Sequence, residues 1–316
     1  MDKILNGLEG VGCYLDDIII TGKDDEEHKR NLLAVVERLN QFNVKLKREK
    51  CVLFQDQIEY FGHVVDKVGL HPSPSKVESL KSAPQPKSLH EVQSLLGFIN
   101  YYRKFIPNLS TIVGPIEQSK SKSKFEWTVE CQNAFDKVKE ILSSEAVLVY
   151  FDPDKDVTLA VDASPRGIGA VISHKILGEE RPIAYASRTL TKAEQNYSQL
   201  EKEALAIVFG VRHFHQYLCG KRFILETDHK PLTYLLGPKR GIPVLAASRL
   251  QRWAILLAGY EYDIKYRTTK QNANADCLSR LPQQTQNKRG RVTISSQCYG
   301  LMKGQRSTRS KLTVCL

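Results

Sequence analysis

The sequence predicts an α/β protein with α+β character that is divided into several domains. In residues 157–282, three short β-branched segments come first, and helical and strand patterns alternate after them, which is typical of a mixed sheet with helical crossovers. Prolines at 84 and 86 and the basic run Ser119–Lys124 separate this part from strand and helix patterns nearer the N-terminus. With 316 residues and 41% apolar content, the chain can bury two or three cores.

Composition excludes several classes of protein. No run of about 18 apolar residues is present, so we expect no membrane span, and the N-terminus MDKILNGLEG lacks the design of a signal peptide. Seven scattered cysteines without a C-x-x-C motif favour reduced thiols over a disulfide frame or zinc site. We therefore expect an intracellular protein of the cytoplasm or nucleus.

The charge balance suggests a polyanionic partner. The formal net charge is +11, and residues 283–316 contribute +7 of it because they contain seven Lys/Arg and no acid. The same tail is low in large apolar residues, so we predict that it is disordered. The modest charge of the remaining body fits a nucleic-acid enzyme without requiring one.

The N-terminal part predicts a small α/β domain. Residues 11–22 indicate a hairpin with Leu15, Asp16 and Asp17 at its tip, and residues 24–42 an amphipathic helix with Leu32, Val35, Val36, Leu39 and Phe42 on its apolar face. Strands are predicted at 51–54 and 58–65, a turn at 66–69 and a helix near 75–81. The tip acids are either a solvated turn or a cation site, because adjacent carboxylates repel unless a cation binds them.

The middle and C-terminal parts predict further helices and one sheet. Ser88–Glu91 has the capping-box pattern and opens a helix ending near Ile106–Pro107, and residues 128–142 form another. After them we predict strands at 158–161, 168–174, 181–187, 222–228 and 262–267, a long helix at 193–217, short helices at 231–236 and 248–258, and a final helix from about Asn272.

Four acids recur at strand ends or on helix faces of this last domain. Asp162 and Asp228 each end a predicted strand, Glu203 lies on the long helix among apolar residues, and Asp276 lies in the final helix. A right-handed crossover would place the first two strands parallel and side by side, with Asp162 and Asp228 at one edge and the long helix laid over it.

Carboxylates gathered in this way would raise one another's pKa unless cations neutralise them. An oxygen-only set without Cys or His favours Mg²⁺ or Mn²⁺ over zinc. Two such ions about 3.5–4 Å apart are a standard arrangement for phosphodiester hydrolysis. The alternative from spacing alone is that these are ordinary surface acids.

The chain resembles a known family in several motifs. VDAS (161–164), YASRTLTKAEQNYSQLEKEALAIVFGVRHFHQYL (185–218), TDHKPL (227–232), SRLQRWAILLAGYEYDIKYR (248–267) and NANADCLSR (272–280) resemble the ribonuclease H of gypsy-type LTR-retrotransposon Pol polyproteins. YLDD (14–17), EYFGHVVDKVGLHPSPSKVESL (59–80) and SLLGFINYYRKFIPNLS (94–110) resemble the catalytic hairpin, primer grip and thumb of its reverse transcriptase. The resemblance covers residues 1 to about 282.

This resemblance implies a fold and a set of domain boundaries. The fold is a partial reverse-transcriptase palm and a helical thumb, followed by a ribonuclease H-like mixed five-stranded sheet with helices. The implied division is palm 1–82, thumb 83–120, tether or connection 121–156, ribonuclease H 157–282 and basic disordered tail 283–316.

The resemblance also implies site residues. Asp162, Glu203, Asp228 and Asp276 match the ribonuclease H acids, and Glu203 is chosen over Glu201 because it directly precedes the apolar ALAIV run. Asp16 and Asp17 match two of the three palm carboxylates. All six are expected to be catalytic and metal-binding, with two Mg²⁺ (or Mn²⁺) ions in the ribonuclease H site.

Some motifs depart from the family pattern. The palm's first metal-binding Asp and the fingers are not found in this sequence. The family's Arg-Pro-Gly before the last acid reads Arg267, Thr268 and Thr269, and Cys277 stands where Ala is usual. The glycine that permits a left-handed turn is therefore absent at this point.

The resemblance implies a truncated Pol protein that is an Mg²⁺-dependent endoribonuclease cutting RNA in RNA–DNA hybrids. Its expected partners are hybrids and other nucleic acid, no membrane, and a dimer partner or other Pol products; the parent element would carry it in a retroelement particle. One alternative is an inert remnant that binds nucleic acid. Another is a reverse transcriptase whose missing fingers and palm come from another chain.

Overall fold

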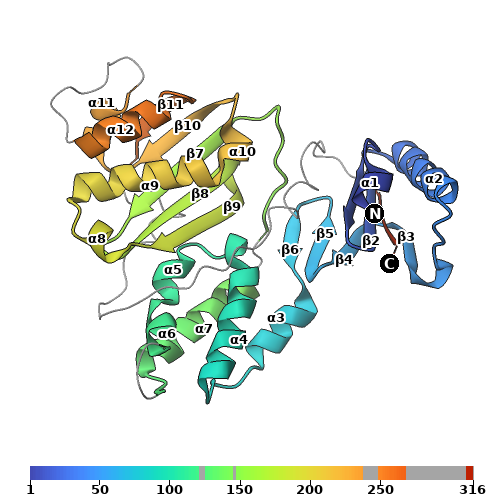
Figure 1. The fold of residues 1–316 in the computed structure, drawn as a ribbon, viewed down its shortest axis with the longest axis horizontal. Coiled ribbons are helices and arrows are strands. Elements are labelled where there is room, and N and C mark those ends of the chain that lie inside the picture. Colours follow the sequence, from blue (N-terminus) through green and yellow to red (C-terminus); the bar gives the residue numbers. More distant parts are fainter. Residues whose placement is uncertain (121–124, 145–146, 238–247, 268–310, 316) are drawn as a thin grey trace. The chain divides into compact units, whose positions relative to one another are not determined.

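A computed structural model describes residues 1–120, 125–144, 147–237 and 248–267, and the backbone of residues 311–315 (Figure 1). The described residues divide into two compact units. The first comprises residues 1–76, 147–154 and the segment 311–315, and the second comprises the rest. The five-domain division inferred from sequence is finer than this and stays a prediction. No helix in the described ranges is long and apolar enough to cross a membrane.

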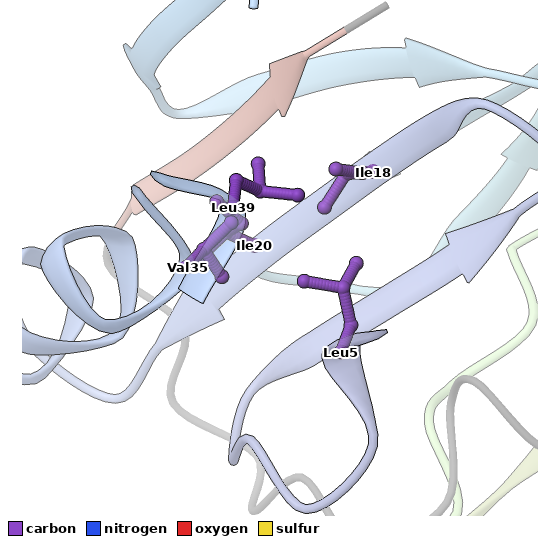
Figure 2. Packing of buried hydrophobic residues seen from close by; sticks show 5 residues of the cluster. All are labelled: Leu5, Ile18, Ile20, Val35 and Leu39. Carbon is purple, nitrogen blue, oxygen red and sulfur yellow. The ribbon is translucent and has the colours of Figure 1, made fainter. Parts of the chain in front are cut away.

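The first unit begins with the predicted hairpin and helix. Strands β1 (Val11–Tyr14) and β2 (Asp17–Gly22) pair antiparallel after the short helix α1 (Asp2–Leu5). Helix α2 (Asp25–Gln41) starts where the Asp24 side chain accepts a hydrogen bond from the Glu27 N–H at 2.7 Å. Figure 2 shows the buried cluster that joins these elements, which consists of Leu5, Ile18, Ile20, Val35 and Leu39. Phe42 lies beyond the helix end and is exposed, so it does not complete the predicted apolar face.

The rest of the first unit contains more strands than the sequence predicted. The elements are η1 (Arg48–Lys50), β3 (Cys51–Gln55), β4 (Gln57–Tyr60), β5 (His63–Asp66) and β6 (Leu70–Pro72). The prediction of one strand over 58–65 is wrong, because a tight turn at Phe61 and Gly62 splits it into β4 and β5. Both turn residues have positive φ, 47° and 64°, which Gly62 adopts without steric cost.

The C-terminal segment corrects a second prediction. Residues 311–315 form strand β12, which pairs antiparallel with β2 on one side and β3 on the other, although the whole tail was predicted to be disordered. Apolar and β-branched residues alternate over Leu312–Val314, and two open strand edges supply backbone partners for such a segment. The remaining tail residues, 283–310 and 316, lie outside the described residues.

A helical region begins with α3 (Pro74–Lys81), whose first three residues belong to the first unit and whose remaining residues belong to the second. The second unit continues with α4 (Leu89–Tyr101), η2 (Arg103–Phe105), α5 (Leu109–Ile112), α6 (Gly114–Ser119) and α7 (Val129–Ser143). Ser88 caps α4 as predicted, by accepting from the Glu91 N–H. The helix ends at Tyr101 rather than near Ile106, because the following residues tighten into the 3₁₀ turn η2.

The mixed five-stranded sheet of the second unit agrees with the predicted fold class. Its strands are β7 (Val157–Ala163), β8 (Gly167–Ile176), β9 (Glu179–Thr189), β10 (Arg222–Thr227) and β11 (Glu261–Tyr266). The order is β11-β10-β7-β8-β9, with β7, β10 and β11 parallel and the β7–β8–β9 meander antiparallel. The predicted crossover that makes β7 and β10 neighbours is therefore confirmed.

The helices of the sheet domain are shorter than predicted. They are α8 (Lys192–Gln195), α9 (Gln199–His213), α10 (His215–Leu218), α11 (Lys230–Leu235) and α12 (Ser248–Leu257). The single helix predicted over 193–217 is wrong, because capping boxes at Thr191 and Ser198 each start a separate helix. The final helix predicted from Asn272 lies outside the described residues.

Helix α9 packs directly on the sheet, across β7 and β8 (Figure 1). A Cβ atom at Gly210 would meet Ala170 Cβ and Val161 Cγ1, each at 3.1 Å. Only glycine therefore allows this approach without displacing buried neighbours. The helical region docks on the edge strand β9, where Arg103 donates to the Ser187 carbonyl at 3.2 Å and the Ser110 N–H donates to Ser187 Oγ at 3.0 Å.

We predict that Gly210→Leu destabilises the protein by about 1–3 kcal/mol, because the added side chain overpacks the α9–sheet contact. Gly97 is the matched control, since it lies inside α4 with nothing within 4 Å of its ideal Cβ. Gly97→Leu should raise stability by up to about 1 kcal/mol through helix propensity. Urea unfolding followed by circular dichroism measures both. Equal effects at the two positions would show that α9 is not pressed against the sheet.

Candidate active site

Two of the predicted acids lie at neighbouring strand ends. Asp162 is the penultimate residue of β7, and Asp228 follows the last residue of β10. The parallel register pairs Glu226 with Ala160, so Asp228 and Asp162 occupy equivalent positions two residues further along. The carboxyl ends of parallel strands meet at one edge of a sheet, which is a common place for ligands. The sheet topology thus brings together acids that are 66 residues apart in sequence.

Helix α9 supplies the third acid. Ser198 and Glu201 form a reciprocal capping box that fixes where the helix starts, and Glu203 follows in the next turn. The close approach permitted at Gly210 holds the same helix against β7 and β8. Glu203 consequently lies among buried residues, with only 3% of its surface exposed.

The three carboxylates converge in a small volume. One ligand oxygen from each of Asp162, Glu203 and Asp228 lies within 4.8 Å of the others. Burial, followed by repulsion from the Asp162 and Asp228 carboxylates, raises the pKa of Glu203 from its ordinary value of 4.5 to about 9. Without a cation, Glu203 is therefore protonated at neutral pH.

Gln199 ties Glu203 to the end of β7. Its side-chain amide donates to Glu203 Oε1 at 2.6 Å and lies 3.4 Å from the Ala163 carbonyl oxygen, which follows Asp162. This bond favours the ionised form of Glu203 and lowers its pKa, against the larger effect of burial. The other oxygen, Glu203 Oε2, is buried and has no hydrogen-bond partner among the described residues. Gln199 thus orients the carboxylate and leaves one oxygen for a ligand.

These residues fit a divalent cation. A buried carboxylate oxygen without a partner, beside two further carboxylates, is an unfavourable arrangement for the protein alone. Oxygen-only donors suit hard cations such as Mg²⁺ or Mn²⁺. Among residues with described side chains, no other group of three or more His, Cys, Asp or Glu residues converges in this way.

The remaining predicted site residues lie elsewhere. Asp16 and Asp17 are at the tip of the β1–β2 hairpin in the first unit, and the preceding Leu15 has a positive φ of 55° and is 74% exposed. Asp276 lies outside the described residues, so its placement stays a prediction. The structure therefore brings together three of the four acids predicted for the C-terminal site.

Glu203, and not Glu201, belongs to the cluster of converging acids. Glu201 caps its own helix and forms an ion pair with Arg249, whose guanidinium lies 3.9 Å from the centre of the Tyr197 ring. These bonds lower the pKa of Glu201, first of all the one from the Ser198 backbone. Gln199 was missed in the sequence, although its i, i+4 spacing to Glu203 places both on one face of a helix.

Comparison with known proteins identifies the family. Residues 1–65 match the family described as reverse transcriptase (RNA-dependent DNA polymerase), and residues 127–225 match the RNase H-like domain found in reverse transcriptase. The retrovirus-related Pol polyprotein from transposon 297 of Drosophila melanogaster is 37% identical over 285 residues, which are 89% of this chain and 26% of that protein. The Pol polyprotein from the Drosophila transposon gypsy is 35% identical over 296 residues, or 89% of this chain and 28% of that protein.

The chain belongs to the Pol polyproteins of gypsy-type retrotransposons. This Pol chain spans about a quarter of the length of those two relatives. Its fold is similar to that of the foamy viral protease-reverse transcriptase, with a TM-score of 0.72 and 22% identity over 84% of this chain and 47% of that one. A second structure of that enzyme, in complex with an RNA/DNA hybrid, gives a TM-score of 0.71 at 22% identity and covers 93% of this chain and 39% of that one.

We predict that Glu203→Gln stabilises this Pol chain in the presence of a chelator, and increasingly so as pH rises. A carboxyl group whose folded-state pKa is about 9 binds a proton that the unfolded chain releases near 4.5, so the stability of the parent falls between these pH values. The variant does not lose stability in this way, so by pH 8 its free energy of unfolding should exceed that of the parent by roughly 2–4 kcal/mol. Urea unfolding in EDTA at pH 5, 6.5 and 8 measures the difference.

Glu201→Gln is the matched control two residues away. The pKa of Glu201 is lowered, so its stabilising effect is present above the unfolded pKa and is lost only as pH falls through the folded value. This variant should be less stable than the parent by the same amount at all three pH values. If the difference in free energy of unfolding between Glu203→Gln and the parent does not change with pH, then the pKa of Glu203 in the folded protein is not raised, which contradicts the prediction.

Proposed function

We propose that this Pol chain cleaves the RNA strand of RNA–DNA hybrids at the Asp162–Glu203–Asp228 cluster, with Mg²⁺ as the metal. The observation that carries this proposal is the convergence of the three carboxylates, together with a buried Glu203 oxygen that has no hydrogen-bond partner in the described part of the chain. Asp162 and Glu203 lie within residues 127–225, which match the RNase H-like domain found in reverse transcriptase, and Asp228 follows three residues after that range. Hydrolysis of a phosphodiester by metal-assisted water attack is the reaction that such a carboxylate set supports.

The residues of the chain have separable tasks in this proposal. Asp162 and Glu203 are almost fully buried and hold the inner side of the site, while Asp228 is half-buried and faces its open side. Gln199 holds Glu203 Oε1 by a hydrogen bond, while Oε2 has no hydrogen-bond partner among the described residues and would be the oxygen available to a cation. The proton on Glu203 must leave before all three carboxylates can act as ligands. Bound Mg²⁺ would supply activation of water and stabilisation of the leaving oxygen.

The substrate is inferred from chemistry and from related structures. A foamy viral relative of similar fold has been solved in complex with an RNA/DNA hybrid. The net charge of +11 favours a polyanionic substrate of this kind. Discrimination of RNA from DNA would rest on the 2′-hydroxyl and on the shape of the minor groove. By family resemblance, Asp276 is proposed as the fourth acid and two ions as the metal complement.

Fewer observations support a polymerase site at the palm acids Asp16 and Asp17. Residues 1–65 match the reverse-transcriptase family, and the hairpin presents Asp16 and Asp17 together. Within the described residues, no third His, Cys, Asp or Glu converges with them to complete a cation site. A working polymerase site would need a further carboxylate besides the acids that the described residues bring together.

We predict that Asp162→Asn lowers cleavage by several orders of magnitude, because it keeps the side-chain volume while removing a ligand charge. Asp263→Asn is the matched control, since Asp263 lies on β11 of the same sheet in an exposed ion pair with Arg222. This control should cleave at close to the parent rate. Single-turnover cleavage of a labelled RNA–DNA hybrid in Mg²⁺ measures both. If Asp162→Asn cleaves like the parent, the cluster is not the active site; if the parent is inactive, the inert-remnant alternative is favoured.

We predict no primer extension by this chain on a primed RNA template, because two palm acids alone do not hold a metal pair in working geometry. Extension is compared with that of a variant carrying Asp16→Asn and Asp17→Asn, which should cleave hybrids normally. Extension by the parent above that variant would contradict the prediction and favour a working polymerase site.

A further inference from the structure

The turn between β7 and β8 follows directly on one of the clustered acids. Strand β7 ends at Ala163, one residue after Asp162, and β8 begins at Gly167. We call residues 164–167 the β7–β8 turn. Arg166 lies in it, four residues after Asp162. Four residues of extended chain span at most about 14 Å, so the backbone of Arg166 lies within that distance of the acid.

The backbone of the β7–β8 turn is fixed from several sides. The Ser164 N–H donates to the Gly167 carbonyl oxygen at 2.8 Å, and the Gly167 N–H donates to Ser164 Oγ at 2.9 Å. The Arg166 carbonyl oxygen accepts from the Leu190 N–H at 2.7 Å. A Cβ atom at Gly167 would lie 3.0 Å from Thr111 Oγ1, so α5 packs closely on the same turn. The turn is thus a rigid support for the one long side chain that it carries.

The guanidinium of Arg166 has no partner among the described residues. Arg166 is half-buried, and its side chain makes no hydrogen bond, ion pair or aromatic contact with them, although three carboxylates converge at the end of the same strand. Five other arginines of the sheet domain each pair with a carboxylate: Arg181, Arg188, Arg222, Arg249 and Arg267. The charge of Arg166 is therefore available for a ligand.

A nucleic-acid substrate needs positive charge at this place. The clustered carboxylates repel a phosphate backbone, and a cation bound between them would act on the scissile phosphate alone. The phosphates on either side of it need other positive groups of the protein. A guanidinium binds a phosphate through two parallel N–H···O bonds, which gives both affinity and orientation. An unpaired arginine on a rigid turn suits this task.

We propose that Arg166 binds a phosphate of the RNA strand of an RNA–DNA hybrid, close to the bond that is cut. This inference rests on the proposed function of the acid cluster and adds a substrate-binding residue to it. The RNA strand is assigned because its scissile phosphate would lie at Asp162, on the same stretch of chain. At about 3.4 Å per nucleotide along one strand, the span of about 14 Å corresponds to about four nucleotides.

The salt dependence of hybrid binding tests the contact. Arg166→Gln should weaken binding about tenfold at low salt, since hydrogen bonds to a charged group are lost. It should also make the slope of log K against log salt shallower by about 1, because one phosphate fewer is neutralised. Arg166→Lys should keep the slope and bind more weakly than the parent, because it retains the charge without the paired donors.

Arg181→Gln is the matched control. Arg181 lies on β9 of the same sheet in an exposed ion pair with Glu179, so its loss should leave the slope unchanged. Binding of a short labelled hybrid is followed by fluorescence anisotropy, with Ca²⁺ as the hard cation in place of Mg²⁺. The urea midpoint of Arg166→Gln should equal that of the parent. A lowered midpoint with an unchanged slope would assign Arg166 to folding and overturn the proposal.

A second experiment locates the phosphate. The RNA strand carries a single 2′-deoxynucleotide with a neutral methylphosphonate at each position in turn, and the same deoxynucleotide with an ordinary phosphate is the control. At the contacted position, the parent should bind about tenfold more weakly, while Arg166→Gln should lose nothing further. Two changes that remove the same interaction are not additive, whereas changes at independent sites are.

The outcomes separate this inference from the proposed nuclease function. Equal salt slopes for Arg166→Gln and the parent, or additive losses at every phosphate of the RNA strand, would overturn it. A non-additive position found on the DNA strand alone would overturn the strand assignment, and a parent that does not bind the hybrid would overturn the whole inference. A parent that binds with the expected slope and non-additive position, yet does not cleave, supports the Arg166 contact and contradicts only the nuclease function.

Discussion

The constraint on which the site depends is the burial of one ionisable group, Glu203, between two other acids. A carboxylate in that position is unfavourable when charged, and its pKa of about 9 expresses this cost. The same three side chains place one ligand oxygen each within 4.8 Å of the others, so a divalent cation bound there would offset this cost. A cluster that is costly alone and complementary to a divalent cation is characteristic of functional sites rather than of stabilising ones.

The contacts that position Glu203 also hold helix α9 in place on the sheet. The capping box at Ser198 starts α9, and Gly210 lets the helix lie close to β7 and β8. The ion pair of Glu201 with Arg249 links α9 to α12. Gln199 then fixes the side chain itself. The site is thus held by regular elements with short contacts, which provides the rigidity that a metal-binding geometry requires.

The first unit combines a core that forms locally with a sheet that depends on a strand distant in sequence. Its core forms locally, from a hairpin and the helix that follows it, as the cluster of Ile18, Ile20, Val35 and Leu39 shows (Figure 2). Its sheet, however, takes its third strand from the far end of the chain. Bringing residues 311–315 to β2 closes a long loop, which costs more conformational entropy than forming a hairpin from adjacent strands. The two units therefore differ in how far their sheets depend on long-range pairing.

The sequence by itself determined the elements whose signals are local. Runs of β-branched and apolar residues predicted β7, β8 and β10, the apolar face of residues 24–42 predicted α2, and the capping-box pattern at Ser88 predicted where α4 begins. The right-handed crossover also predicted that Asp162 and Asp228 lie at one edge of the sheet, whereas Glu203 was chosen over Glu201 from the family resemblance. Family resemblance implied catalytic roles for Asp16, Asp17 and Asp276, and these roles stay predictions.

Only the tertiary structure decided the features that depend on contacts between distant segments. The turn at Gly62 and the break before α9 also had local signals, a glycine and the capping boxes at Thr191 and Ser198, which the predicted strand and helix ran across. The bond from Gln199 to Glu203 exists because α9 is pressed onto β7, a fact of packing rather than of spacing. The short apolar and β-branched pattern of residues 311–315 does not by itself determine their pairing with β2 and β3, since a strand is stabilised by partners that its own sequence does not contain.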